Sequence, residues 1–295
     1  PAFQPSVQCT PKSAASKKPS LDYNRAHMKQ WLILTAAAGL SGFADDSLSR
    51  YLSAEAERQL EQRARAIAAI RTPEEVRARQ AYVRSRILEA IGGLPAPKTP
   101  LNARITGGFA RQGYRVENLI YESLPGFHVT ANVYVPAGKG PFPAVLGPAG
   151  HSVNGKASAI YQRMWIALAK QGFLVRAYDP PGQGDRLEYF DPETGGSKAG
   201  VGTREHMMAG LQCLPTGTNF ARYEIWDGIR GLDYLLTRDD VDPQRIGVAG
   251  NSGGGTQSAY LMALEPRLAA AAPSCYLTSW ELLWKGGGPQ DSEQV

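Results

Sequence analysis

The chain has 295 residues, of which 43% are hydrophobic and 20% are charged, a balance that is ordinary for a soluble globular protein. Its formal net charge of +5 arises mainly from residues 1–44, because the remaining residues carry 27 basic and 26 acidic side chains. A nucleic-acid-binding surface needs clustered excess charge in the folded part, so the composition predicts no nucleic-acid partner.

The first 44 residues are expected to form no part of the folded domain. Residues 1–27 are rich in Pro, Ser and Lys and lack hydrophobic periodicity, so they are predicted to be a disordered tail. Residues 28–44 begin "MK", continue with an apolar run and end in small residues, which is the layout of a secretory signal peptide. We therefore expect cleavage after Ala44 and a secreted or periplasmic protein without a stable membrane span. The alternative is a buried N-terminal helix.

Residues 45–97 are predicted to be a helical extension. Between Ser49 and Ile91 apolar residues recur every three or four positions among charged ones. Thr72 is the expected N-cap of the second helix, with Glu75 at the capping-box position. Two glycines and a proline-rich linker then end the helical pattern.

Residues 98–295 are predicted to form one α/β domain. Two alternating strands joined by a Leu-Pro-Gly turn predict an antiparallel hairpin, and strands then alternate with helices, which predicts a mostly parallel central sheet. The expected strands lie in 114–123, 127–136, 142–150, 173–185, 245–251 and 268–277, and the expected helices are 157–171, 220–237 and 253–264. A long loop is expected over 190–219.

The sequence "RIGVAGNSGGGTQSAYL" predicts a strand, a sharp turn at Ser252 and a helix, the arrangement of the nucleophilic serine in the α/β-hydrolase fold. Gly250 and Gly254 are expected to avoid clashes two residues before and after the serine. The backbone N–H of Gly253 would then face developing negative charge at the helix N-terminus. One alternative is a glycine-rich turn whose serine has no catalytic role. A phosphate-binding loop is not indicated, because no Lys follows at the required spacing.

The loop "GPAGHSVNGK" is the expected source of a second oxyanion donor, since it follows the third strand of the predicted fold. Gly150 would let the backbone turn close to the serine, and the N–H of His151 is the candidate donor. An ordinary glycine-rich loop is the alternative.

The motifs "GPAGHSVNGK", "YDPPGQGDR", "REHMMAGLQ", "WDGIRGLDYL", "GNSGGG" and "SCYLTSWELL…GPQDSEQ" together resemble bacterial secreted α/β-hydrolases related to acetyl xylan esterases and cephalosporin-C deacetylases. The resemblance runs from about residue 60 to the C-terminus. It implies a serine esterase that deacylates carbohydrates without a cofactor, with Ser252 as nucleophile and the amides of Gly253 and His151 as oxyanion donors. It also implies that the triad acid and histidine lie on loops after the last strands, beyond residue 295.

The four histidines of the sequence all precede Ser252. His27 falls in the tail, His128 is expected at the surface of the hairpin, and His151 and His206 are weaker candidates for the general base. Asp291 is the nearest late acid and is expected to have no partner. The resulting hypothesis is a C-terminally truncated hydrolase that lacks its last strands and helices, exposes a sheet edge and hydrolyses esters slowly.

Several residues keep alternative interpretations. Arg186 follows a strand at the predicted ligand-binding edge and could bind an acidic or sugar group, or form a structural ion pair. His206 could bind substrate or be an ordinary loop residue. Cys213 and Cys275 could form a disulfide or be two buried thiols.

Other features are predicted to be absent, and some questions stay open. No metal cluster or dinucleotide fingerprint is visible in the sequence. Rival functions are a peptidase or lipase on the same fold and a catalytically silent relative that binds carbohydrate or a partner. The oligomeric state is open.

Overall fold

The computed structural model describes residues 47–286 and 291–294 of the chain. The tail predicted over 1–27 and the signal peptide predicted over 28–44 lie outside the described residues, so those interpretations remain predictions. Within the described residues, no helix is both long enough and apolar enough to cross a membrane.

Two helices open the described part of the chain, α2 (Ser47–Ala68) and α3 (Pro73–Ala90). The hydroxyl of Thr72 accepts a hydrogen bond from the N–H of Glu75 at 3.2 Å, and the Glu75 carboxylate accepts one from the N–H of Thr72 at 3.0 Å. This reciprocal pair satisfies two backbone donors at the start of α3. The helices and the capping box predicted from the sequence are therefore confirmed.

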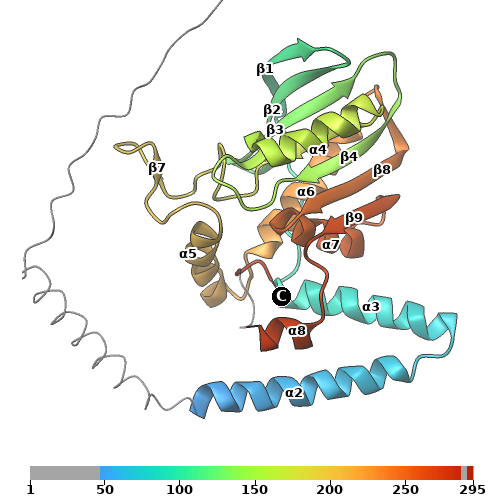
Figure 1. The fold of residues 1–295 in the computed structure, drawn as a ribbon, viewed down its shortest axis with the longest axis vertical. Coiled ribbons are helices and arrows are strands. Elements are labelled where there is room, and N and C mark those ends of the chain that lie inside the picture. The colour runs from blue at the N-terminus through green and yellow to red at the C-terminus, as the bar shows by residue number, and fades with distance from the viewer. Residues whose placement is uncertain (1–46, 287–290, 295) are drawn as a thin grey trace, which may run out of the picture. The chain divides into compact units, whose positions relative to one another are not determined.

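The described residues from position 60 onward form one compact unit, built on a seven-stranded sheet with the strand order β1-β2-β3-β5-β4-β8-β9 (Figure 1). Each of the pairs β1–β2, β2–β3 and β3–β5 is antiparallel, whereas β5, β4, β8 and β9 run parallel. The strands are β1 (Arg104–Arg111), β2 (Tyr114–Leu124), β3 (Phe127–Pro136), β4 (Phe142–Pro148), β5 (Leu174–Tyr178), β8 (Val241–Asn251) and β9 (Ala270–Ser274). The predicted α/β fold with an antiparallel hairpin is confirmed.

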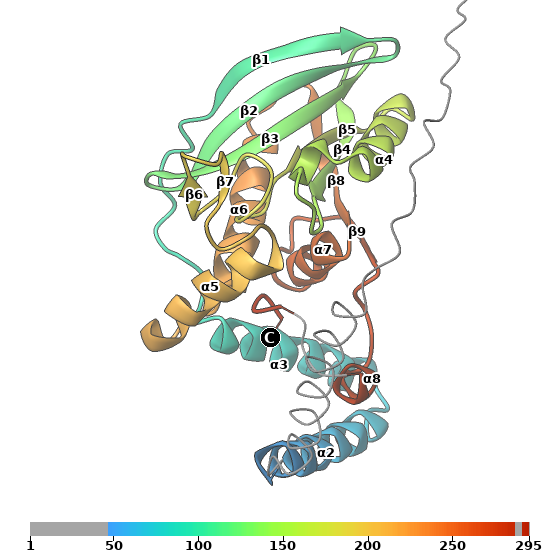
Figure 2. The same cartoon turned by 60° about the vertical axis from the view of Figure 1, so that its left-hand side comes forward.

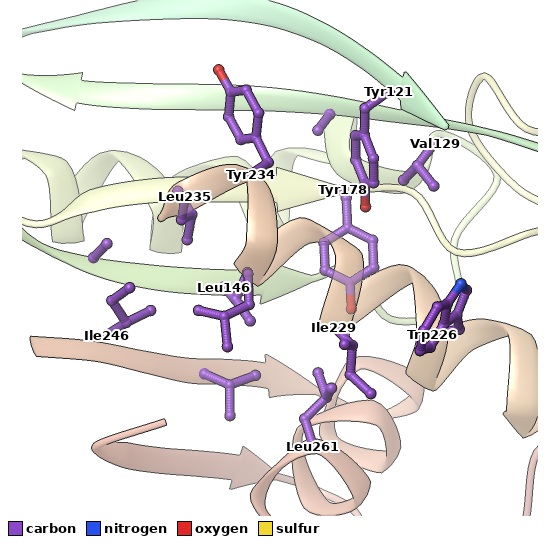
Figure 3. Packing of buried hydrophobic residues seen from close by; sticks show 14 of the residues in the cluster. Tyr121, Val129, Leu146, Tyr178, Trp226, Ile229, Tyr234, Leu235, Ile246 and Leu261 are labelled. Carbon is purple, nitrogen blue, oxygen red and sulfur yellow. The ribbon is translucent and has the colours of Figure 1, made fainter. Parts of the chain in front are cut away.

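Different helices cover the two faces of the sheet (Figure 2). The covering helices are α4 (Ala159–Lys170) on one face and α6 (Ala221–Leu235) and α7 (Gly253–Leu264) on the other. The side chains of β5 alternate between them, because Tyr178 packs with α6 and α7 whereas Val175 packs with Trp165 of α4. Figure 3 shows Tyr178 of the sheet beside Ile229 of α6 and Leu261 of α7.

The four parallel strands end at one edge of the sheet. Asp179 follows β5, His151 lies in the loop after β4, Ser252 follows β8, and Ser274 is the last residue of β9. In open α/β sheets this carboxyl edge is where ligands bind. The sheet therefore gathers most of the predicted site residues at one edge.

β9 is the last strand of the sheet at this end, and three of its five residues are exposed. A groove of about 540 Å³ borders it, lined by residues of β4, β8 and β9 and by Leu168 and Phe173. Among the described strands, β9 is thus an exposed edge bordered by apolar side chains.

The segment 190–219, predicted to be a long loop, is instead structured, and that prediction is wrong. It contains β6 (Phe190–Asp191), β7 (Gly196–Ser197), α5 (Thr203–Cys213) and the short 3-10 helix η3 (Leu214–Thr216). Two of the four buried residues of α5, Glu205 and His206, are polar. A helix that buries polar side chains lacks the apolar periodicity by which helices are recognised.

β1 is missing from the sequence prediction as well. All eight of its residues are exposed, and it contains two adjacent glycines, so neither alternation nor strand propensity marks it. Of the two remaining short elements, η2 covers Gly155–Ala157 and α8 covers Trp280–Lys285.

The two described cysteines are free. Cys213 is buried and Cys275 is exposed. The disulfide considered for this pair is not formed, and the alternative of two buried thiols holds only for Cys213.

Candidate active site

Ser252 is the single residue between β8 and α7. It has φ 57° and ψ −122°, in the left-handed region that a residue with a side chain rarely adopts, and it is exposed to solvent. Its N–H donates to the carbonyl of Ser274 at 2.9 Å, and its carbonyl accepts from the N–H of Thr256 at 3.0 Å. Such strain persists only where the surroundings enforce it, and β9 and α7 do so here.

Two glycines make the tight turn sterically feasible. A Cβ at Gly250 would lie 2.4 Å from the carbonyl oxygen of Gly254, and a Cβ at Gly254 would lie 2.2 Å from the carbonyl oxygen of Pro148. Backbone atoms cannot rotate away as a flexible side chain can. The structure therefore shows a steric reason for glycine at both positions.

The loop after β4 approaches the same turn. A Cβ at Gly150 would lie 2.2 Å from the carbonyl oxygen of Asn251, so this loop lies against the residue before Ser252. A Cβ at Gly253 would lie 2.7 Å from Cε1 of His151, so the imidazole packs directly on the first residue of α7. The N–H of Gly253 is one of the donors that a helix start leaves without an intrahelical partner. The two residues predicted to supply the oxyanion donors are thus neighbours in space.

The loop after β4 is held in place by a buried ion pair. Asp179 accepts hydrogen bonds from the backbone N–H of Lys156 at 2.6 Å and from its ammonium group at 2.5 Å. Gly155 adopts φ +49° where a Cβ would meet the Asp179 carboxylate. The "NGK" part of the loop is therefore explained by packing around one carboxylate.

The prediction that Asp291 has no partner is wrong. Its Oδ2 lies 2.9 Å from Nε2 of His151 and 3.0 Å from Nδ1 of His206, and the two ring nitrogens are 3.3 Å apart. The loop after β4, α5 and the segment 291–294 thus meet at one point beside Gly253.

Burial and hydrogen bonding act in opposite directions on this cluster. Burial raises the pKa of Asp291, but hydrogen bonds with His151 and His206 lower it well below its usual range. Burial lowers the pKa of His151, but the hydrogen bond to Asp291 and the negative charges of Glu293 and Asp291 together outweigh burial and raise the pKa overall. Burial, and then the neighbouring Glu293, raise the pKa of Glu224 well above its ordinary value.

His206 lies on α5 rather than in a loop, and only 1% of its surface is exposed. Its Nε2 faces the carbonyl of Pro181 at 2.8 Å, while its Nδ1 faces Asp291. No spacing motif could have revealed this arrangement, because positions 151, 206, 291 and 293 are far apart in the chain.

Arg186 has the surroundings of a structural ion pair. Its Nη1 lies 2.7 Å from Oδ2 of Asp227 and donates to the carbonyl of Asp179 at 2.9 Å. Both charged side chains are nearly inaccessible, at 3% and 1% exposed. Trp226 is buried on the same helix as Asp227. His128 is exposed on β3, as expected from the sequence.

Comparisons with known proteins agree with this fold. A family model described as acetyl xylan esterase (AXE1) matches residues 103–290. The provisionally assigned hydrolase YtaP of Bacillus subtilis is 27% identical over 214 residues, which cover 68% of this chain and 66% of the relative.

Two solved structures are similar as well. A provisionally assigned acetyl xylan esterase from Bacteroides fragilis has a TM-score of 0.62 at 21% identity, covering 76% of this chain and 62% of that chain. A methylesterase has a TM-score of 0.59 at 28% identity, covering 71% of this chain and 44% of that chain. The present chain thus spans less than two thirds of the length of each of these relatives.

Proposed function

Because this chain belongs to the acetyl xylan esterase family, we propose that it is a serine esterase that removes acetyl groups from carbohydrates. The observation that carries the proposal is the strained, exposed Ser252 between β8 and the N-terminus of α7. A hydroxyl that is held there at the cost of backbone strain is suited to nucleophilic attack.

In the proposed reaction Ser252 Oγ attacks the acyl carbon of the ester. The carbonyl oxygen becomes an oxyanion, stabilised by the N–H groups of Gly253 and His151 and by the N-terminus of α7. The sugar alcohol leaves with a proton, and water then hydrolyses the acyl–serine bond.

Turnover also requires a base for the Ser252 proton, and we assign this role to neither His151 nor His206. A general base must lie within hydrogen-bond reach of the proton that it accepts. Asp291 pairs with Nε2 of His151 and with Nδ1 of His206, and Nε2 of His206 faces the carbonyl of Pro181. Among the hydrogen bonds of the described residues, none joins Ser252 to either imidazole ring.

Hydrolysis by the 295-residue chain is therefore expected to be slow. Serine hydrolases without a working base retain roughly 10³–10⁴-fold acceleration over water. Initial rates should be measured with acetylated xylo-oligosaccharides, a carbohydrate methyl ester, long-chain acyl esters and peptides. We expect acetylated sugars to be the best substrates.

Two variants make the assay decisive. Ser252→Ala should abolish the acceleration, whereas Ser152→Ala, which removes a hydroxyl bonded to Gly155 in the neighbouring loop, should not. Preference for peptides or long-chain esters would favour the rival peptidase or lipase, and no Ser252-dependent turnover would favour a silent binding relative. Ordinary enzymatic rates for the unaltered chain would contradict the expectation of slow hydrolysis.

We also propose that the protein is exported through the segment 28–44. The layout of that segment supports the proposal. Intact-mass measurement of protein recovered from the periplasm or medium should show a chain that begins at residue 45, and retention of residues 28–44 would contradict export by this signal.

A further inference from the structure

Four side chains with metal-ligating atoms meet beside the candidate nucleophile. They come from three separate segments: His151 from the loop after β4, His206 from α5, and Asp291 and Glu293 from the segment 291–294. One ligand atom from each lies within 4.8 Å of all the others. His206, Asp291 and Glu293 are buried, so the cluster is not a solvated acidic surface.

The three closest atoms have the spacing of ligands around a small cation. Asp291 Oδ2, His151 Nε2 and His206 Nδ1 are separated by 2.9, 3.0 and 3.3 Å. Zinc binds imidazole nitrogen and carboxylate oxygen at about 2.0–2.2 Å, which separates tetrahedral ligands by roughly 3.3 Å.

The hydrogen bond made by His206 supports the same assignment. Its Nε2 lies 2.8 Å from the carbonyl oxygen of Pro181, so Nε2 carries the proton. In the neutral ring Nδ1 then directs a lone pair at Asp291 Oδ2, which is unfavourable unless a proton or cation lies between them. Metal-binding histidines usually donate their other N–H to such a carbonyl or carboxylate group.

Glu293 provides an independent observation. Its side chain is 1% exposed, and its Oε2 has no hydrogen-bond partner among the described residues. A buried carboxylate oxygen without a partner is costly, and this one belongs to the cluster.

The local charge balance points the same way. Asp291 and Glu293 are buried close together, so two carboxylates are taken from water at one place. Among the described residues, the ion-pair partners of Asp291 are the two histidines, and no lysine or arginine pairs with either acid. A divalent cation would supply the missing positive charge.

We propose that His151 Nε2, His206 Nδ1 and the carboxylates of Asp291 and Glu293 bind one divalent transition-metal cation. Zinc is the best match to two imidazoles and two carboxylates. The cation ties segment 291–294 and α5 to the loop that carries His151. It therefore fixes the imidazole ring of His151 that packs on Gly253, independently of whether Ser252 hydrolyses esters.

The test uses the tag-free 295-residue chain, stripped of metal by a chelator and then titrated with zinc by calorimetry. We expect uptake of one zinc per chain, a rise in Tm, and a visible absorption band when cobalt replaces zinc. Glu293→Gln and Asp291→Asn keep the side-chain shape and should weaken zinc binding by at least about 10–100-fold. His128→Gln removes an exposed histidine of β3 and is the matched control.

Circular dichroism of the metal-free variants identifies any variant that fails to fold. The zinc stoichiometry and the cobalt spectrum are measured on the unaltered chain, so they test the proposal even if a variant does not fold. Absence of stoichiometric uptake of zinc, cobalt and manganese would overturn the proposal and leave a proton-sharing network. Equal affinity in the folded Glu293→Gln and control chains would overturn it too. Ser252→Ala should bind zinc normally, so failure of the esterase proposal is distinguishable.

Discussion

Ser252 adopts a positive φ in a turn whose glycine neighbours are closely packed. Gly250, Gly253 and Gly254 each occupy a place where a Cβ would meet backbone atoms or the His151 ring at 2.2–2.7 Å. The strained backbone of Ser252 and the absence of side chains at its glycine neighbours both result from the close packing of this turn.

Substitution at Gly254 tests this geometry. Gly254→Ala should lower the free energy of unfolding by about 1–3 kcal/mol, because the new methyl group would collide with the Pro148 carbonyl. Urea unfolding measures the loss. Gly107→Ala is the control, since a Cβ there makes an ordinary 3.6 Å contact, and the change should stay within about 0.5 kcal/mol. Equal stability of the two variants would contradict the account of the turn.

At this scale the sequence predicts the turn but not the cluster beside it. The glycines around Ser252 follow a local steric rule that can be recognised from five consecutive residues. The pairing of His151 with Asp291 is set by tertiary packing across 140 positions, and no local pattern reports it.

At the scale of elements, Arg186 joins the loop after β5 to α6 through Asp227. Removing one partner of a buried pair leaves the other charge uncompensated, which costs about 3–5 kcal/mol. We therefore expect Arg186→Met to destabilise the protein by that amount in urea unfolding. The double variant Arg186→Met/Asp227→Leu should recover part of the loss, because it leaves no buried charge alone.

The same pair of variants separates the two interpretations of Arg186. A structural ion pair predicts a stability loss with KM for acetylated sugars unchanged in the folded fraction. Unchanged stability with a raised KM would instead show that Arg186 binds substrate.

Elements with strong local signals are predicted well from the sequence. α7 covers the predicted residues 253–264, and the capping box of α3 begins at the predicted Thr72. β1 and α5 were missed because their exposure and burial do not follow side-chain polarity: β1 is exposed on both faces, and α5 buries Glu205 and His206.

At the scale of residues 60–295, the parallel sheet assembles the site. The order β5-β4-β8-β9 brings the residues at the ends of four strands to one edge, although they are spread from position 151 to position 274 of the sequence. Strand order depends on long-range pairing, so the sequence predicted an α/β sheet but not which segments would surround Ser252. The segment 291–294, which carries Asp291 and Glu293, is the clearest example.

The central claim is that the Ser252 hydroxyl, at the carboxyl edge of the parallel strands, is the nucleophile of the proposed esterase reaction. The most direct measurement is prolonged reaction of the folded chain with a fluorophosphonate, followed by peptide mass spectrometry. The account predicts a slow, single adduct on the peptide that contains Ser252, absent after unfolding in urea and absent in Ser252→Ala. An adduct confined to another serine, or none after long incubation of the folded chain, would contradict it.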